Sequence, residues 1–329
     1  MQSSWEEQRA RLYSLLGPLP ERQAPYEVVL ESREERENCI LERLELSLKE
    51  NSGLFQEPVP MIFLYPKHLD GPVPAVLFCH SHGGRYELGK DELLLGNSYM
   101  FQEPYADALI REGWAVLAFD AWCFGQRRKD LHPEYREGNY PVTHTSVTES
   151  EVFKDMLWQG EILWGHMVYD GLRAFDYLKS RLETDSRRIA SLGMSMGSTL
   201  SFWLAALEPG IKVCVDLCCQ TDFDALAKEN GFDRHGLFYY VPGLRRHFHT
   251  ADIDCMIAPR PHLSTIGELD PLTPLEGVRR IAKQVNECYQ HLKSEGRPAD
   301  DYQVLYYPVA HQETPEMRED VLRFLRNKL

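Results

Sequence analysis

One short motif, Gly193-Met194-Ser195-Met196-Gly197, most constrains how this chain can fold. It follows an apolar run (188–192) and precedes a helix-like segment (198–207). A tight turn between a strand and a helix leaves no room for bulk beside the serine, and the two glycines meet that requirement. The turn lifts the serine hydroxyl above the edge of the sheet, where the N-terminus of the helix directs backbone N–H groups at the same point. The motif therefore predicts a strand, a sharp turn that presents a nucleophilic serine, and a helix.

The chain also supplies a base for this serine and an acid to orient the base, which a serine nucleophile requires. Residues 261–266 are typical of a buried strand, and the loop after them contains Asp270. Residues 302–307 are typical of a last strand and lead into His311. The order Ser, Asp, His and the positions just past strand ends are those of sites in open α/β sheets. We predict Ser195 as the nucleophile, Asp270 as the acid and His311 as the base.

A histidine-glycine loop follows another apolar strand (76–79) and has the sequence His80-Ser81-His82-Gly83-Gly84. Loops of this type donate a backbone N–H to the negative oxygen that develops during acyl transfer. We predict the amides of His82 and Met196 as the two donors of this oxyanion hole. Two ordinary loop histidines are the alternative interpretation of His80 and His82. We expect no metal at them, because no further ligand at suitable spacing joins them.

With these motifs together, the chain resembles the α/β-hydrolase superfamily. More narrowly it resembles serine esterases of the dienelactone hydrolase and acetyl xylan esterase group, and the catalytic domain of prolyl oligopeptidases. The resemblance runs from about Val59 to the C-terminus, and it is carried by residues 80–84, Asp120 with 125–128, 193–197, 267–274 and His311. Dienelactone hydrolases use a cysteine where this chain has Ser195, so their enol-lactone substrate is not implied. Ala310 precedes the histidine where relatives commonly have glycine.

Strands that alternate with helices indicate a mostly parallel sheet covered by helices on both faces, and the resemblance implies the α/β-hydrolase fold. We predict strands at 40–46, 59–65, 76–79, 114–119, 188–192, 213–217, 261–266 and 302–307, and helices at 5–16, 101–112, 162–181, 198–207, 275–294 and 315–327. We expect the strands at 40–46 and 59–65 to be antiparallel at the sheet edge. We expect a single domain over residues 1–329, with an N-terminal helical extension at 1–25.

Two connections are far longer than the usual ~2–6 residues, and we predict them to be cap-like insertions. They span residues 127–160 and 221–258, and the second contains the aromatic cluster Phe238-Tyr239-Tyr240. We predict that these three aromatic residues line a substrate pocket. Surface packing or a contact between subunits is the alternative role for both insertions.

Several charged residues have alternative uses near the predicted site. Glu268 is the second candidate for the acid, but it directly follows Gly267 and is expected to lie in the strand. Asp120 precedes the serine in the chain, so we expect it to brace a neighbouring loop. Arg127 and Arg128 could bind an anionic substrate, but a salt bridge to Asp120 or to a carboxylate of the cap is favoured.

The function that these residues indicate is hydrolysis of a small-molecule ester through a covalent acyl-enzyme, with no metal or organic cofactor. Two other functions stay open. One is a serine peptidase that acts on small peptides, although the chain lacks room for the propeller domain of prolyl oligopeptidases. The other is a binding protein that retains the fold without catalysis.

Composition excludes some partners. The net charge of −14 argues against nucleic acid and anionic membranes, and no apolar run reaches the ~18 residues of a membrane span. The first 22 residues are charged and lack the apolar core of a signal peptide. The eight cysteines show no C-x-x-C pair, so we expect reduced, structural thiols and a cytoplasmic location. The sequence does not predict the oligomeric state.

Overall fold

The computed structural model of the protein describes residues 4–48, 57–128, 145–297, 299 and 301–329, and for residues 145–148 it describes the backbone alone. These residues form a nine-stranded sheet with the order β1-β2-β3-β5-β4-β6-β7-β8-β9. Neighbouring strands from β5 to β9 are parallel, whereas β1, β2 and β3 run antiparallel along one edge. The strands are β1 (Tyr26–Glu35), β2 (Cys39–Leu48), β3 (Val59–Pro66), β4 (Val73–Cys79), β5 (Ala115–Phe119), β6 (Thr184–Met194), β7 (Val213–Leu217), β8 (His262–Gly267) and β9 (Tyr302–Tyr307).

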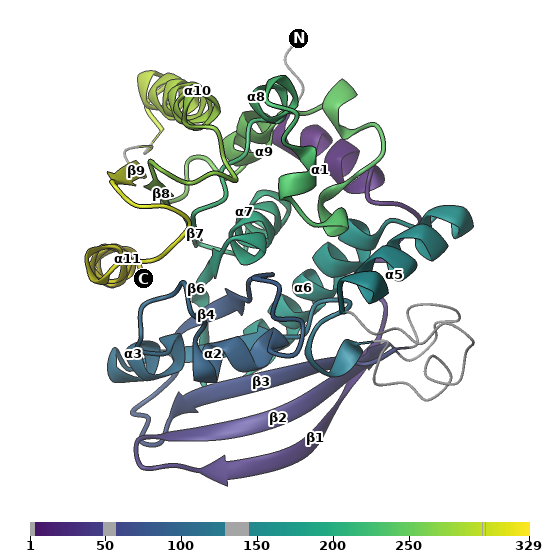
Figure 1. Cartoon of the computed structure of the whole chain (residues 1–329). Helices are drawn as coiled ribbons and strands as arrows, with labels where there is room; N and C mark the ends of the chain where they lie inside the picture. The colour runs from purple at the N-terminus through teal and green to yellow at the C-terminus, as the bar shows by residue number, and fades with distance from the viewer. Residues whose placement is uncertain (1–3, 49–56, 129–144, 298, 300) are drawn as a thin grey trace.

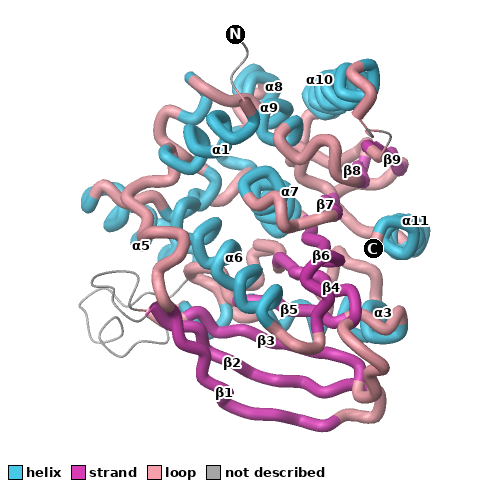
Figure 2. Tube along the Cα trace, turned by 180° about the vertical axis from the view of Figure 1, so that it is seen from behind, coloured by secondary structure: helices cyan, strands magenta, loops and turns pink. Residues whose placement is uncertain are grey.

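Helices cover both faces of this sheet, which confirms the predicted fold class (Figure 1, Figure 2). One face carries α3 and α11, and the other carries α1, α6 and α7. The helices are α1 (Trp5–Ser14), α2 (Glu92–Leu95), α3 (Tyr105–Arg111), α5 (Thr145–Gln159), α6 (Leu163–Ser180), α7 (Met196–Leu207), α8 (Phe223–Lys228), α9 (Thr250–Cys255), α10 (Leu275–Ser294) and α11 (Pro315–Lys328). Because both faces are covered, every residue of β5 and of β7 is buried.

The predicted elements agree with the structure within a few residues, and β7, β9 and α10 have the predicted bounds. Several elements were not predicted: the short helices α2, α8 and α9, the strand β1 and the longer helix α5. β1 pairs with β2 but is largely exposed, and its charged residues interrupt the alternation by which a half-buried strand is recognised. It therefore forms the sheet edge that we had assigned to the next two strands. The helix α5 lies within the first insertion, for which we had predicted a cap-like role without naming its elements.

Both insertions contain regular structure. In the first, residues 129–144 lie outside the described part of the chain, and α5 follows them. The second contains α8, three short 3₁₀ turns (Phe232–Arg234, Leu237–Tyr239 and Leu244–Arg246) and α9. The insertions meet where the amide of Phe238 donates to the Glu149 side chain of α5, at 3.1 Å.

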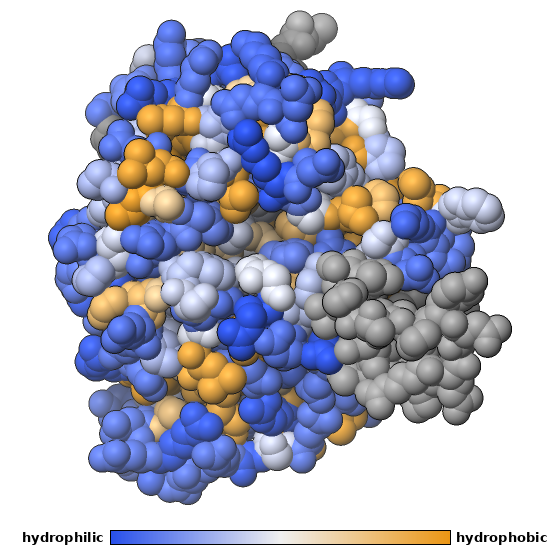
Figure 3. All heavy atoms as spheres, viewed as in Figure 1, coloured by the Kyte–Doolittle hydropathy of each residue, from blue (hydrophilic) through white to orange (hydrophobic). Residues whose placement is uncertain are grey.

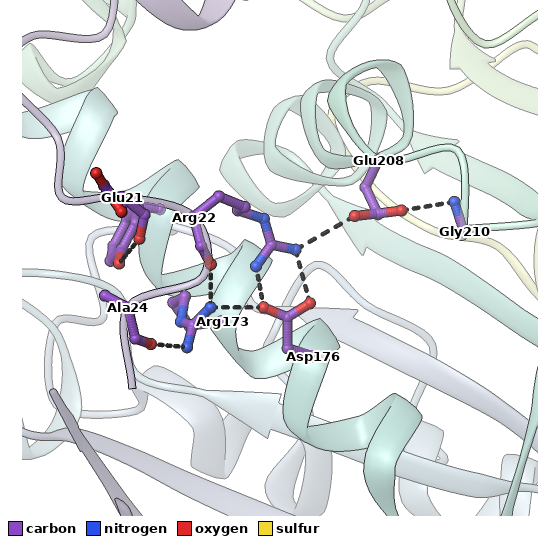
Figure 4. Close-up of polar contacts among 8 residues, drawn as sticks. Glu21, Arg22, Ala24, Arg173, Asp176, Glu208 and Gly210 are labelled. Carbon is purple, nitrogen blue, oxygen red and sulfur yellow. Dashed lines mark hydrogen bonds and ion pairs between the residues drawn. The ribbon is translucent and has the colours of Figure 1, made fainter. Parts of the chain in front are cut away.

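Two arginines attach the N-terminal segment to helix α6 and to the end of helix α7 (Figure 4). Arg173 of α6 donates to the backbone carbonyl oxygens of Arg22 and Ala24, the latter at 2.6 Å, and pairs with Asp176 at 2.8 Å. Arg22 in turn pairs with Asp176 and, at 3.2 Å, with Glu208 just after α7. Since Arg173 is only 3% exposed, these contacts replace the water that its guanidinium has lost.

On the side shown in Figure 3, the hydrophobic residues of the described part of the chain form separate groups among hydrophilic ones. Within the described ranges, no helix combines the length and apolar character needed to cross a bilayer. The eight cysteines all lie in those ranges and form no disulfide bond. The cytoplasmic location stays a prediction.

Replacing Arg173 by methionine should detach the N-terminal segment, because the carbonyl oxygens of Arg22 and Ala24 lose their donor. We expect Arg173→Met to lower the free energy of unfolding by about 3 kcal/mol. Urea unfolding followed by circular dichroism would measure this. Lys179→Met, on the exposed side of the same helix, is the control and should change stability by less than about 0.5 kcal/mol. Equal stability of the two variants would contradict the role given to Arg173.

Candidate active site

Ser195 lies at the junction of β6 and α7 with a strained backbone. Its φ is +59° and its ψ is −121°, a conformation that residues with a side chain rarely adopt. Its amide donates to the carbonyl of Leu217 at 2.9 Å, and its carbonyl accepts from the amide of Thr199 at 3.1 Å. The turn is therefore held both by the neighbouring strand β7 and by the helix that follows it. This is the strand, turn and helix that the motif predicts.

Gly193 and Gly197 allow the turn to touch the end of β4. A Cβ atom at Gly193 would overlap with the carbonyl oxygens of Gly197 and Cys79, and one at Gly197 would overlap with the carbonyl of Cys79. Because β4 leads directly into residues 80–84, the absence of two side chains brings the serine turn against the histidine-glycine loop. The glycines of the motif thus serve a contact between two strands as well as the turn itself.

His311 and Asp270 form a hydrogen-bonded pair, and His311 and Ser195 line one common cavity. Nδ1 of His311 lies 2.6 Å from Oδ2 of Asp270, whose side chain is fully buried. Oδ1 of Asp270 accepts from the amide of Leu272 at 2.9 Å. Since a carboxylate only accepts, Nδ1 carries the proton and Nε2 keeps its lone pair. In the described part of the chain Nε2 is buried and has no hydrogen-bond partner, so it is available to a serine hydroxyl or a substrate.

Backbone contacts join the loop after β8 to the segment after β9, and so bring the acid to the histidine. The amide of Leu269 donates to the carbonyl of Val309 at 2.9 Å. Nearby, Gly267 packs so closely on the carbonyl of Ala310 that a Cβ atom would overlap with it. The geometry of the pair therefore follows from two parallel strands that end side by side.

The two predicted oxyanion donors lie in the same place. Met196 is the first residue of α7, so its amide has no acceptor within the helix. Among the described residues, neither this amide nor that of His82 donates a hydrogen bond to the protein. Both residues line the cavity in front of Ser195. Their role in binding an oxyanion stays a prediction.

This cavity has a volume of about 630 Å³, which is in the range of sites for small molecules. Both insertions contribute to its wall, together with the loops that follow β4, β8 and β9. Its lining residues are His82, Gly83, Gly84, Tyr86, Tyr99, Glu149, Ser195, Met196, Cys219, Asp233, Arg234, His235, Gly236, Leu237, Phe238, Leu272 and His311.

The predicted aromatic cluster needs a correction, because of its three members the cavity is lined by Phe238 and not by Tyr239 or Tyr240. The Tyr239 ring is buried and stacks on His235, with 5.1 Å between ring centres. The hydroxyl of Tyr240 donates to the carbonyl of Phe232 at 2.8 Å. Adjacent residues in a 3₁₀ turn point in different directions, so one of the three faces the cavity and the others pack within the insertion.

Glu149 and Tyr86 also line the cavity, and we did not predict them from the sequence. Oε2 of Glu149 lies 2.7 Å from Nε2 of His82 and accepts from the Tyr86 hydroxyl at 2.6 Å. Oε1 accepts from the amide of Phe238 at 3.1 Å. Burial raises the pKa of Glu149, but the donors together outweigh burial and hold the pKa below its usual value.

Burial keeps other groups near the cavity uncharged. It raises the pKa of Cys219 to about 12, so this cysteine is a thiol and a poor nucleophile at neutral pH. It lowers the pKa of both His80 and His235. Nε2 of His80 accepts from the amide of Ala121 at 3.1 Å, so this histidine braces the ends of β4 and β5 and does not reach the cavity.

Asp120 braces a loop, as predicted, and is fully buried. It accepts from the amide and the ammonium group of Lys90, both at 2.7 Å, and from the amide of Gln126 at 3.0 Å. The partner predicted for Arg127 was wrong: its guanidinium pairs with Asp170 of α6 at 2.6 Å. The pair is buried, and Arg127 does not line the cavity.

One buried group has the composition of a metal site, but its contacts do not favour one. Cys214, Asp216 and His262 place possible ligand atoms within 4.8 Å of one another, on β7 and β8. Nε2 of His262 already lies at a hydrogen-bond distance of 2.6 Å from Asp216. Burial raises the pKa of Cys214 well above its usual value, whereas a metal needs the thiolate. The three residues do not line the cavity.

Comparison with known proteins agrees with this fold. A model of the Abhydrolase family matches residues 4–302. The chain belongs to the Abhydrolase family. The chain is also 44% identical over 323 residues to "Putative hydrolase YtaP" of Bacillus subtilis (strain 168). This match covers 98% of this chain and 99% of that protein.

Two solved structures share the fold of this Abhydrolase chain over nearly its whole length. A protein of Bacteroides fragilis described as a "putative acetyl xylan esterase" has a TM-score of 0.70 and 21% identity, and the match covers 95% of this chain and 76% of that one. A glucuronoyl esterase from Solibacter usitatus has a TM-score of 0.67 and 13% identity, over 99% and 92% of the two chains. At these identities the similarity concerns the fold.

The structure separates the two candidate acids. Asp270 contacts His311, whereas a carboxylate oxygen of Glu268 lies 3.5 Å from Arg279 in a partly exposed pair. We expect Asp270→Asn to lower kcat by about 10³–10⁴-fold, because an amide favours the wrong tautomer of the histidine. Its matched control, Glu268→Gln, should lower kcat less than about tenfold. Steady-state kinetics on one ester would compare them, and the reverse order would contradict the assignment of Asp270.

Proposed function

We propose that the protein is a serine esterase that hydrolyses carboxylic esters through an acyl-enzyme. The observation that carries the proposal is the His311–Asp270 pair beside a cavity that Ser195 lines from a strained turn, with Nε2 of His311 making no hydrogen bond to any residue that the structure describes. The name of the Bacillus subtilis relative, a hydrolase, and those of the two structural neighbours, both esterases, support it.

In the proposed mechanism, the hydroxyl oxygen of Ser195 attacks the ester carbonyl while Nε2 of His311 accepts its proton. The same nitrogen then delivers the proton to the leaving alcohol, and the acyl group stays on the serine. Water enters, gives a proton to Nε2 and attacks the acyl carbonyl; the bond to the serine oxygen then breaks, Nε2 returns the proton to that oxygen, and the acid is released. Asp270 holds the Nδ1–H tautomer and stabilises the imidazolium that forms in each half of the reaction.

The amides of His82 and Met196 are proposed to receive the negative oxygen of each tetrahedral intermediate. A donor in such a position lowers the barrier by roughly 3–4 kcal/mol when it is shielded from water. The N-terminus of α7 adds a favourable field at the same point. The contact of Gly193 and Gly197 with the end of β4 supports this arrangement, because it fixes the separation between the two amides.

The cavity favours an ester whose alcohol carries several hydroxyl groups, such as an acetylated sugar. Asp233 and Arg234 are exposed in its wall and can exchange hydrogen bonds with hydroxyl groups of a ligand, whereas the hydroxyls of Tyr86 and Tyr99 already have partners in Glu149 and Asn97. Polar side chains placed in this way favour a ligand that offers matching polar groups. Short aliphatic esters and lactones are the alternatives that a substrate panel would test.

Hydrolysis should depend on Ser195. We expect wild-type protein to cleave acetylated monosaccharides and p-nitrophenyl acetate, and to leave aminoacyl p-nitroanilides uncleaved. Ser195→Ala should lower ester turnover by about 10³-fold or more with the unfolding temperature unchanged. Preferential cleavage of the anilides would favour the peptidase alternative. Equal turnover by wild type and Ser195→Ala would contradict the proposed nucleophile.

A further inference from the structure

Glu149 lies where three separate parts of the chain meet. It belongs to α5 in the first insertion, and its side chain is 3% exposed. One carboxylate oxygen contacts His82 of the histidine-glycine loop and Tyr86 just after it, and the other accepts from the amide of Phe238 in the second insertion. A single carboxylate thus joins both insertions to the loop that carries a predicted oxyanion donor.

These contacts make Glu149 unsuited to take protons. Both oxygens are engaged by N–H and O–H donors, and together these hold the pKa below the usual value although burial raises it. The N–H and O–H donors stabilise the negative charge on the carboxylate, so it is a poor acceptor for a proton from water or substrate. The arrangement therefore indicates a fixed acceptor that orients its neighbours, and not a second base.

The hydrogen bonds of His82 define its tautomer. Nδ1 accepts from the amide of Gly84 at 3.2 Å, so the proton is on Nε2, which donates to Glu149. The ring also packs edge-on against Tyr86 and against Phe124, with ring centres 4.9 and 5.2 Å apart. The side chain of His82 is therefore held from several directions, and its backbone amide is held with it.

The loop needs such an anchor because its own backbone is irregular. Gly83 and Gly84 both have positive φ, at +49° and +67°. The residue before His82 is fixed by its amide, which donates to Glu92 at 2.8 Å. On the other side of His82, the glycines offer no side chain, so the imidazole supplies the side-chain contacts at this point of the loop, while the carbonyl of His82 accepts from the amide of Arg85 at 3.1 Å.

We propose that Glu149 is the positioning residue of the oxyanion hole: it holds His82 so that the backbone N–H of His82 faces the reacting carbonyl. This inference rests on the proposed esterase function. It gives the first insertion a part in the chemistry, because the donor is in place only when α5 and the turn at Leu237–Tyr239 are docked on the loop.

The test starts from Glu149→Gln. A neutral amide accepts hydrogen bonds at one end only, so at least one of the donors from His82, Tyr86 and Phe238 loses its acceptor. We expect kcat to fall by about 10- to 100-fold, somewhat less than the loss of a whole oxyanion donor, while KM changes less than about threefold. Glu151→Gln, an exposed residue on the same helix, is the matched control and should keep wild-type kinetics.

A double-mutant cycle with His82→Ala separates positioning from a general structural role. If Glu149 acts through His82, Glu149→Gln should cost less than about threefold in kcat once the imidazole is gone. An equal cost in the two backgrounds would overturn the proposal. Tyr86→Phe keeps the ring and removes one donor to Glu149, so it provides a milder variant if Glu149→Gln does not fold, and its smaller loss of kcat should also vanish in the His82→Ala background.

The two proposals fail in different ways. Activity that survives Ser195→Ala would overturn the esterase mechanism, whatever the behaviour of Glu149. Activity that is lost in Ser195→Ala but unchanged in Glu149→Gln would leave that mechanism in place and overturn the role of Glu149. Binding of an aliphatic boronic acid, which forms a tetrahedral adduct with serine, gives a second readout: we expect Glu149→Gln to weaken it about as much as it lowers kcat.

Discussion

The close contact between the serine turn and the end of β4 is the constraint on which the rest of the site depends. A side chain at Gly193 or Gly197 would overlap with the carbonyl of Cys79, so both strands can end at the same point only because these residues are glycines. The contact places the strained Ser195 beside the histidine-glycine loop. The hydrogen bond from Ser195 to Leu217 of β7 holds the turn from its other side. Strain in one residue is thus maintained by a parallel sheet that is buried on both faces.

The remaining groups come from two different sources. The pair of Asp270 and His311 is built by the ends of β8 and β9, which are part of the regular scaffold. The cavity wall, in contrast, is completed by the insertions, and Glu149 joins them to the loop after β4. A scaffold of this kind can keep its reaction while the insertions change the substrate. In this chain the insertions also touch the machinery itself, so changes in them are expected to affect turnover as well as specificity.

The sequence was informative wherever chemistry and local geometry require particular residues. The motif around Ser195, the order of acid and base, and long apolar strands such as β3 could be recognised without a structure. β1 could not, because an exposed edge strand has no hydrophobic period. The direction of Tyr239 and Tyr240 depends on a 3₁₀ turn, and the contacts of Glu149 depend on tertiary packing. One signal for Glu149 was present: buried Val152 and Met156 follow it at helical spacing, which puts a carboxylate on the apolar face of α5.

The most direct test of the central claim is covalent labelling of the nucleophile. A fluorophosphonate reacts with a serine that is activated by a histidine and supported by an oxyanion hole, and mass spectrometry of the intact chain followed by peptide mapping locates the adduct. We predict one phosphonyl group per chain, on the peptide that contains Ser195, and no adduct in Ser195→Ala. An unlabelled wild-type chain that is folded, or an adduct on another residue with Ser195 unmodified, would contradict the claim.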